Sequence, residues 1–589
     1  MPLNRISVYI FLWEGVILKR IICLILSLVI VFFCCVTVGA AKDETPVIFV
    51  PGFIETVIGI NVNEKNEELL WPFSFQSVLG KMVTDSPALM TLIAGLMFGN
   101  FDRLGARIGS DAEDILHKLT CNPDGSSDYA VESFPQDPAL CNVGYLAKHK
   151  NGKYLAMVDI SKSVAEKTDP DRTFVFCYNS QLDCLALASQ LRSFIKSVKE
   201  YTGSAKVRLC SHSYGGQIIA AYFYRYLKDN DVKKAVMIYP ALAGTDAIKH
   251  ILEADADVPL DDIIVFAENL LSLPAEGEKL LIKKYFHYID EFASGGLAEL
   301  SGMWRYWGSM YSLCSNEYYE LLKKEFLDPV ESAPIIKAND IVHYDLIPNL
   351  RKIFKKCQAK GIDLSIISGS GMQECLGGDD NTDILLPTKL ATGAYCAKYG
   401  EHFCDGYNAK RTTCCNPCHN HVSPAMNIDA STAFLPENTW FVEGAFHGAY
   451  PNQEYTMTLI EKLLLTDEIK NVYSDSDYPQ FGYSDNVNMG IDFSFDKSLP
   501  GFISSDDKTI VIKNLNKVTP IKILSVCASG LDIEFDAIKS AAVLPGKCVK
   551  IRYRGDIPEV KGKRTDITIK YAEGARLNTM TRSFTVNNK

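Results

Sequence analysis

The sequence predicts an α/β protein with a doubly wound, mostly parallel sheet, followed by a small all-β domain. Short apolar runs alternate with helical segments from residue 46 to about residue 240, which is the pattern of a parallel sheet covered by helices. After about residue 491, short alternating runs are separated by Gly, Asn and Pro turns. Such runs are typical of a β-sandwich of the immunoglobulin-like type.

The elements of the sheet follow one another in the order strand, helix, strand. Short apolar runs ended by turns predict buried strands. They cover residues 46–50, 173–178, 207–210, 235–239, 362–367 and, as the last strand, 439–442. Apolar residues at helical spacing predict helices over residues 184–201, closed by Gly203, and over residues 216–227.

The chain has 589 residues, more than one hydrophobic core typically organises, so we expect several domains. Residues 41–490 are expected to form the α/β domain and residues 491–589 the sandwich. Residues 246–335 are helix-prone and rich in aromatic side chains, which favours a helical cap over the sheet. Residues 396–421 carry five cysteines and favour a stapled surface excursion.

Residues 1–40 have the pattern of a secretory signal peptide. Lys19 and Arg20 precede an apolar run over residues 21–38, and small residues follow, so cleavage after Ala40 is expected. The apolar run is also long enough to span a bilayer, which makes an uncleaved membrane anchor the alternative. In both cases the rest of the chain is predicted to be secreted or lumenal, in an endomembrane or lysosome-like compartment.

The 18 cysteines fit an oxidising compartment. Three of them lie in residues 1–40, and the odd number that remains predicts at least one thiol without a disulfide within the chain. Local bridges are plausible between Cys121 and Cys141 and between Cys527 and Cys548. Cys210 is expected to be a buried free thiol.

One group of cysteines and histidines has ligand types that zinc prefers. It consists of Cys414, Cys415, Cys418, His419 and His421. Outside the cytosol disulfides are the expected use of such cysteines, so we predict no metal site. No cofactor is expected.

The strongest local signal for chemistry is the segment 211–216, Ser-His-Ser-Tyr-Gly-Gly, between a predicted strand and a predicted helix. A tight strand-to-helix turn exposes the hydroxyl of a serine nucleophile and requires small residues around it. Ser213 is therefore the candidate nucleophile. The usual pattern is Gly-x-Ser-x-Gly, and Ser211 replaces its first glycine.

A serine nucleophile needs a histidine base, which in this type of fold follows the acid in chain order. His447 lies in a loop directly after the strand at residues 439–442, which is the expected place for the base. His402, His419 and His421 lie within the cysteine-rich excursion and are poorer candidates.

The acid is expected in the loop that follows the strand at residues 362–367. Asp379, Asp380 and Asp383 all lie there. Asp383 is the best placed, four residues ahead of Pro387, and Asp380 is the second choice. The alternative is that these acids are solvated or bind a cation.

The oxyanion hole requires two backbone donors. One is predicted to be the N–H of Tyr214, the residue after the nucleophile. The other should come from the loop after the first strand, where Phe53 is our choice and Ile54 the reserve.

Four stretches together resemble the lecithin:cholesterol acyltransferase-like branch of the α/β hydrolases. They are residues 46–52, which are similar to the first-strand motif, residues 176–183, residues 207–217 with the nucleophile, and residues 379–387 with the acid. Alignment on Pro387 places the acid on Asp383. The chain departs from the family pattern at Ser211, at Asn179-Ser180 in place of Asp-Trp, and at Ile384 in place of a glycine.

This resemblance implies an α/β-hydrolase fold and a lipase or phospholipase that cleaves carboxylic esters of lipids in two steps, through an acyl-enzyme. A membrane surface is then a plausible contact, with the cap binding an acyl chain, although a packed helical core explains the same aromatic pattern. The resemblance covers residues 45–465 and leaves out the C-terminal sandwich.

Other functions use the same residues. An O-acyltransferase or a thioesterase would need the same triad, and a secreted binding protein built on an inactive hydrolase scaffold would show the same fold. The complete set of Ser, Asp and His in the expected order favours an enzyme. Nucleic acid is not an expected partner, because the formal net charge is −11 and basic residues form no run.

Overall fold

The computed structural model describes the chain in separate stretches. They are residues 45–71, 117–149, 159–254, 301–374, 378–404, 406–411, 421–448, 454–484, 490–498, 502–516, 519–529, 531–538, 542–557, 563–573 and 576–586. The predicted leader at residues 1–40 and the central part of the predicted cap, residues 255–300, lie outside them. Among the residues that are described, no helix combines the length and apolar character needed to cross a membrane.

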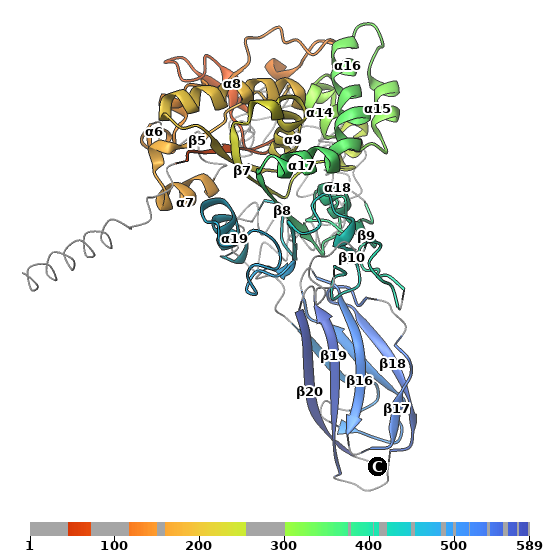
Figure 1. Cartoon of the computed structure of the whole chain (residues 1–589). Coiled ribbons are helices and arrows are strands. Elements are labelled where there is room, and N and C mark those ends of the chain that lie inside the picture. Colours follow the sequence, from red (N-terminus) through yellow and green to blue (C-terminus); the bar gives the residue numbers. More distant parts are fainter. Residues whose placement is uncertain are drawn as a thin grey trace, which may run out of the picture. The chain divides into compact units, whose positions relative to one another are not determined.

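A sheet of seven parallel strands forms the centre of the α/β domain (Figure 1). Its spatial order is β12-β11-β8-β7-β6-β1-β5. The strands are β1 (Val47–Val50), β5 (Thr173–Val175), β6 (Val207–His212), β7 (Val232–Ile238), β8 (Asp363–Ser370), β11 (Thr439–Glu443) and β12 (Phe481–Tyr483). All residues of β1 and β6 are buried, which explains why these strands are nearly continuous apolar runs.

The predicted α/β class and its parallel sheet are confirmed, with one correction at the edge. Residues 439–442 were expected to form the last strand, but β12 follows and pairs in parallel with β11. This strand has only three residues, one of them a glycine, so its apolar run is too short to predict from the sequence.

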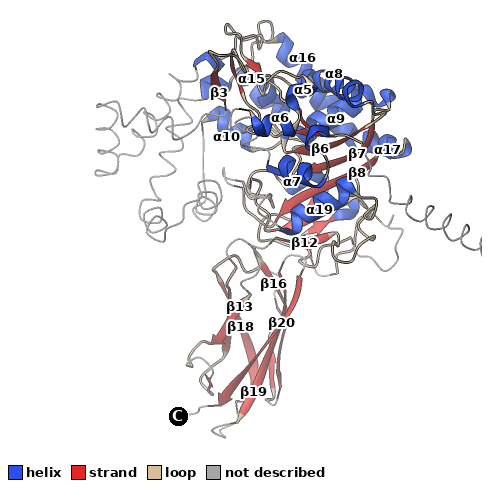
Figure 2. Cartoon of the chain, turned by 90° about the vertical axis from the view of Figure 1, so that its left-hand side faces the viewer, coloured by secondary structure: helices blue, strands red, loops and turns tan. Residues whose placement is uncertain are grey.

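Helices cover both faces of the sheet (Figures 1 and 2). On one face lie α8 (Cys184–Thr202), α9 (Tyr214–Tyr226) and α17 (Leu350–Ala359); on the other lie α7 (Asp159–Lys167) and α19 (Glu454–Leu465). The side chain of Asp183 caps the start of α8, and Gly203 ends it in the left-handed conformation with φ 69°, as its sequence predicts.

Shorter elements surround this core. The remaining helices are α5 (Pro138–Cys141), α6 (Val143–Lys148), α10 (Ala247–Glu253), α14 (Gly308–Leu313), α15 (Tyr319–Phe326), α16 (Ala333–Ile341) and α18 (Thr388–Thr392). Two small antiparallel sheets consist of β2 (Ile58–Ile60), β3 (Glu68–Trp71) and β4 (Glu132–Ser133), and of β9 (Tyr395–Cys396) and β10 (Ile428–Asp429). The described parts of the predicted cap region are thus largely helical.

The C-terminal residues form two four-stranded sheets. One contains β13 (Ile491–Phe495), β15 (Thr509–Asn514), β18 (Cys548–Gly555) and β17 (Ile533–Phe535); the other contains β14 (Phe502–Ile503), β20 (Arg576–Val586), β19 (Arg564–Glu573) and β16 (Ile521–Ser529). Alternate residues such as Ile510 and Ile512, and Ile567 and Ile569, are fully buried in one apolar cluster. This alternation is what predicted a sandwich from the sequence.

The two local disulfides expected from the sequence are not formed. Cys121, Cys141, Cys527 and Cys548 are all free thiols. The Sγ of Cys141 instead donates to the carbonyl of Pro135 at 2.8 Å, and Cys527 and Cys548 lie on strands of different sheets. Cys210 is a buried free thiol, as expected.

Candidate active site

The residues predicted to carry chemistry all follow strands of the parallel sheet at their carboxyl ends. Ser213 follows β6, Asp383 lies in the segment after β8, and His447 lies four residues after β11. Phe53 follows β1, which is the strand between β5 and β6. The next strand of this sheet along the chain, β5, lies on one side of β1, and the one after it, β6, lies on the other side. Open α/β sheets place their sites at such a switch point.

Ser213 occupies a strained turn between β6 and α9. Its backbone has φ 53° and ψ −122°, a combination that a serine adopts only when the surrounding structure enforces it. The N–H of Ser213 donates to the carbonyl of Ile238 at 3.1 Å, and its carbonyl accepts from Gly216 at 2.9 Å and Ala241 at 3.0 Å. These three bonds hold the turn, and the serine itself stays half-buried.

The small residues of the motif are required by close backbone approach. A Cβ on Gly215 would lie 2.1 Å from the carbonyl oxygen of Val50, and one on Gly216 would lie 2.4 Å from the Cβ of Pro240. Ser211, which departs from the usual glycine, lies within β6 and pairs with Val50 and Met237.

Asp383 and His447 form a buried hydrogen-bonded pair. The Nδ1 of His447 lies 2.8 Å from the Oδ2 of Asp383, and the two side chains are 10% and 2% exposed. The backbone N–H of His447 also donates to the carbonyl of Asp383 at 3.0 Å. The other carboxylate oxygen of Asp383 accepts from the N–H groups of Leu385 and Leu386. With both oxygens occupied, the carboxylate has a fixed orientation toward the imidazole.

The other two acids of this loop are used differently. Asp380 pairs with Lys389 at 2.7 Å, and exposed Asp379 pairs with Lys398. Ile384, at the position where the resembled family has glycine, has φ 82°. This left-handed backbone is unfavourable for a β-branched residue. The fully buried side chain of Ile384 packs with Met372 and Phe446, which offsets the strain.

Glu55, which is not among the residues predicted from the sequence, bonds to the residue next to Ser213. Its carboxylate lies 2.9 Å from the Nδ1 of His212 and accepts from the N–H of Gly52 at 2.5 Å. Burial alone would raise the pKa of Glu55, but the charge and hydrogen bond of His212 and the Gly52 bond outweigh it, so the pKa is lowered. An acidic residue within five positions of the first strand was the signal available in the sequence.

His212 connects this carboxylate with the predicted base. The Nε2 of His212 lies 3.0 Å from the carbonyl oxygen of His447, and the two rings are 4.7 Å apart with an interplanar angle of 36°. His212 is 6% exposed. The chain Glu55–His212–His447 therefore joins the loops after β1, β6 and β11 beside Ser213.

The two predicted oxyanion donors belong to segments that adjoin the nucleophile. Tyr214 is the first residue of α9, so its N–H has no acceptor within the helix. The loop with Phe53 is a tight turn in which Glu55 donates to the carbonyl of Gly52, and a Cβ on Gly52 would lie 3.0 Å from the Cβ of Ser213. Ile54, the reserve candidate, is 46% exposed.

Aromatic side chains pack around the Phe53 loop. The ring of Phe53 contacts Trp71, Tyr214 and Trp307 with centroid distances of 5.7, 6.4 and 5.8 Å. Trp307 is fully buried, and its indole N–H donates to the carbonyl of Leu119 at 2.9 Å. This tryptophan of the predicted cap therefore belongs to the packed interior.

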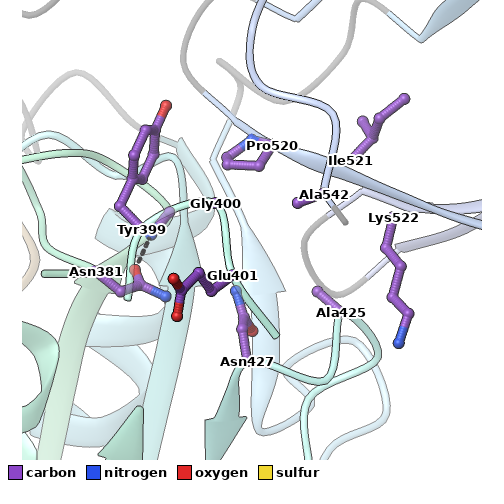
Figure 3. Close-up of a pocket in the computed structure, with 11 residues that line it drawn as sticks. Asn381, Tyr399, Gly400, Glu401, Ala425, Asn427, Pro520, Ile521, Lys522 and Ala542 are labelled. Atoms are coloured by element: carbon purple, nitrogen blue, oxygen red, sulfur yellow. Dashed lines mark hydrogen bonds between the residues drawn. The ribbon is translucent and has the colours of Figure 1, made fainter. Parts of the chain in front are cut away.

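A small pocket lies close to the segment after β8 but is not a substrate site (Figure 3). Its lining includes Gly371, Asn381, Glu401 and Lys522. Its volume of about 10 Å³ holds about one water molecule. The side-chain oxygen of Asn381 accepts from the N–H of Gly371 at 2.6 Å, which ties the loop to the residue directly after β8.

The predicted alternative bases lie away from this arrangement or outside the described residues. His421 bonds to Gln480 at 2.8 Å, and His402 is half-buried near Phe403 in the cysteine-rich region. His419 and the cysteines Cys414, Cys415 and Cys418 lie outside the described residues, as does part of the predicted excursion.

No family model matches this chain, and no curated protein does either. Among solved structures, this chain has a distant similarity to lipases and phospholipases. The Tle4 chain of a Tle4–Tli4 complex is 12% identical, with 72% of this chain and 98% of that chain covered and a TM-score of 0.29. The lipase BlEst2 of Bacillus licheniformis is 10% identical, with 72% of this chain and 88% of that chain covered and a TM-score of 0.26. The phospholipase PlaB of Legionella pneumophila is 11% identical, with 72% of this chain and 86% of that chain covered and a TM-score of 0.24.

Proposed function

We propose that this protein is a serine hydrolase that cleaves carboxylic esters of lipids by a two-step acyl-enzyme mechanism. The observation that carries the proposal is the buried bond between His447 and Asp383 beside a strained serine turn. A base oriented by a carboxylate, next to a serine held on such a turn, is the arrangement that activates a hydroxyl as nucleophile.

In the first step the hydroxyl of Ser213 attacks the ester carbonyl while the Nε2 of His447 takes its proton. Asp383 holds the imidazole by its Nδ1 and stabilises the imidazolium. The N–H groups of Tyr214 and Phe53 are our candidates for stabilising the oxyanion. When the intermediate collapses, the C–O bond to the alcohol breaks and the alcohol leaves with the proton from His447.

In the second step water attacks the acyl-enzyme, again with His447 as the base. The acid is released and Ser213 recovers its proton. An acceptor alcohol in place of water would give acyl transfer with the same residues, so the reaction is a hydrolysis or a transfer depending on which nucleophile enters. The lipid specificity rests on the resemblance of the four sequence stretches to the lecithin:cholesterol acyltransferase-like branch.

Covalent labelling with a fluorophosphonate probe tests the proposal. Wild type should be labelled, and Ser213→Ala and His447→Ala should not. Asp383→Asn should lose about 10⁴-fold in the labelling rate, since the imidazole then takes the wrong tautomer. Asp379→Asn, which changes an exposed carboxylate of the same loop, is the matched control and should label like wild type. Absence of labelling in folded wild type would leave a binding protein on a hydrolase scaffold.

We also propose that residues 1–40 direct the chain into the secretory pathway and are removed after Ala40. Mass determination of the mature N-terminus tests this directly. A chain that begins at Ala41 is the expected result. An intact N-terminus in the membrane fraction would instead identify the apolar run as an anchor.

A further inference from the structure

Three carboxylates meet beside the loop that carries Asp383. Asp246 lies at the start of α10, after β7, and Glu374 and Asp380 both follow β8. One carboxylate oxygen of each residue lies within 4.8 Å of one from each of the others. These residues are distinct from the pair Asp383–His447, and the proposed ester hydrolysis makes no use of them.

The carboxylate of Glu374 is buried with an unsatisfied oxygen. Glu374 is 1% exposed, and its Oε1 has no hydrogen-bond partner. The Oδ1 of half-buried Asp246 is also without one. A buried carboxylate oxygen without a partner is costly, so two such oxygens in one cluster indicate a ligand that interacts with both.

The charge of the cluster is only partly compensated. Lys389 lies 2.7 Å from the Oδ2 of Asp380 and neutralises one of the three carboxylates. Glu317 adds further negative potential at Asp246. Three carboxylates therefore meet where one lysine pairs with only one of them.

We infer that Asp246, Glu374 and Asp380 form a binding site for a calcium ion. All three ligands are oxygens, which excludes the sulfur and nitrogen sets typical of zinc. Calcium binds oxygen at about 2.3–2.6 Å, so two of its ligands are at most about 4.6–5.2 Å apart. The oxygen separations fit this span. Two positive charges also match the two carboxylates that Lys389 leaves uncompensated.

The ion would join the segment between β7 and α10 to the loop after β8. Asp380 is three residues from Asp383, and the two belong to the same loop. Calcium would therefore stabilise the loop that orients the base, without contact with the reacting atoms.

Calcium binding to the chelator-treated, full-length chain tests the inference, with isothermal titration of CaCl₂ as the measurement. Wild type should bind calcium and gain thermal stability from it. Glu374→Gln and Asp246→Asn should each weaken the binding at least about tenfold, since even outer groups of metal sites have effects of this size. Asp379→Asn, in the same loop but with its carboxylate exposed and paired with Lys398, should bind like wild type.

Circular dichroism identifies variants that remain folded. The inference fails if folded wild type binds no calcium, because the cluster is then satisfied by a proton. It also fails if folded Glu374→Gln and Asp246→Asn both bind as tightly as wild type, since the ion then lies elsewhere. Binding is measured without a substrate, so the result is independent of whether Ser213 is a nucleophile.

Discussion

The carboxylate of Glu55 lies 2.9 Å from the Nδ1 of His212, the residue that directly precedes Ser213. Glu55 also accepts the N–H of Gly52, and His212 bonds through its other nitrogen to the carbonyl of His447. One buried acid thus positions the loop of the expected oxyanion donor Phe53 and the loop of the expected base.

Replacement of Glu55 by glutamine should impair turnover more than binding. Glutamine keeps the size but loses the charge that holds His212 and Gly52, so we expect kcat to fall by about 10- to 100-fold with KM nearly unchanged. Steady-state kinetics on a soluble ester measures both. Glu331→Gln, on an exposed side chain, is the control. A kcat for Glu55→Gln within twofold of wild type would show that this acid has no positioning role.

Ile384 allows a test of backbone strain in the acid loop. Because its φ is 82°, replacement by glycine relieves strain that replacement by alanine keeps, while both lose the same buried contacts with Met372 and Phe446. Ile384→Gly should therefore be more stable than Ile384→Ala by about 1–2 kcal/mol. Urea unfolding of the two variants measures the difference. If alanine is the more stable of the two, the left-handed backbone is not strained.

Gly215 should tolerate no side chain. Since its Cβ would lie 2.1 Å from the carbonyl oxygen of Val50, alanine must push α9 away from β1. We expect Gly215→Ala to lower the free energy of unfolding by about 3 kcal/mol, measured by chemical denaturation. The control is Gly302→Ala, where an added Cβ has no neighbour within 4 Å. Equal stability of the two variants would contradict the close approach of helix and strand.

Glu443 predicts a pH dependence of stability. Burial raises its pKa to about 7, against the hydrogen bond from Ser370, while its ordinary value is 4.5. Between these values the folded state holds a proton that the unfolded chain has lost, so the free energy of unfolding falls as pH rises, by roughly 3 kcal/mol. Glu443→Gln cannot titrate and should lack this component.

Unfolding by urea at pH 5 and at pH 8 measures the effect of Glu443. The free energy of unfolding should decrease more from pH 5 to pH 8 in wild type than in Glu443→Gln. All other titrating groups contribute equally to the decrease in both proteins. Glu331→Gln should keep the decrease of wild type. If the free energy of unfolding decreases as much in Glu443→Gln as in wild type, Glu443 is ionised in the folded protein at both pH 5 and pH 8.

Local pattern was sufficient for the strands of the parallel sheet other than β12, and for the strand, turn and helix around Ser213. Residues 46–50 and 207–210 are apolar without interruption because both faces of their strands are buried. Strand, tight turn and helix are neighbours in the chain around Ser213, so the turn leaves a local signature. The order of acid and base along the chain then restricted the choice to a few residues.

The tertiary structure decided what depends on residues distant in the sequence. The spacing to Pro387 favoured Asp383 over Asp380, but only the position of the β11 loop shows that Asp383 bonds to His447 whereas Asp380 pairs with Lys389. The partner of Glu55 is His212, which lies on a distant strand, β6. Likewise, only the folded chain shows that Cys121 and Cys141 are both buried and do not form a disulfide. A sequence determines its strands through local burial and period, but the partner of a side chain is determined by how separate strand ends meet in space.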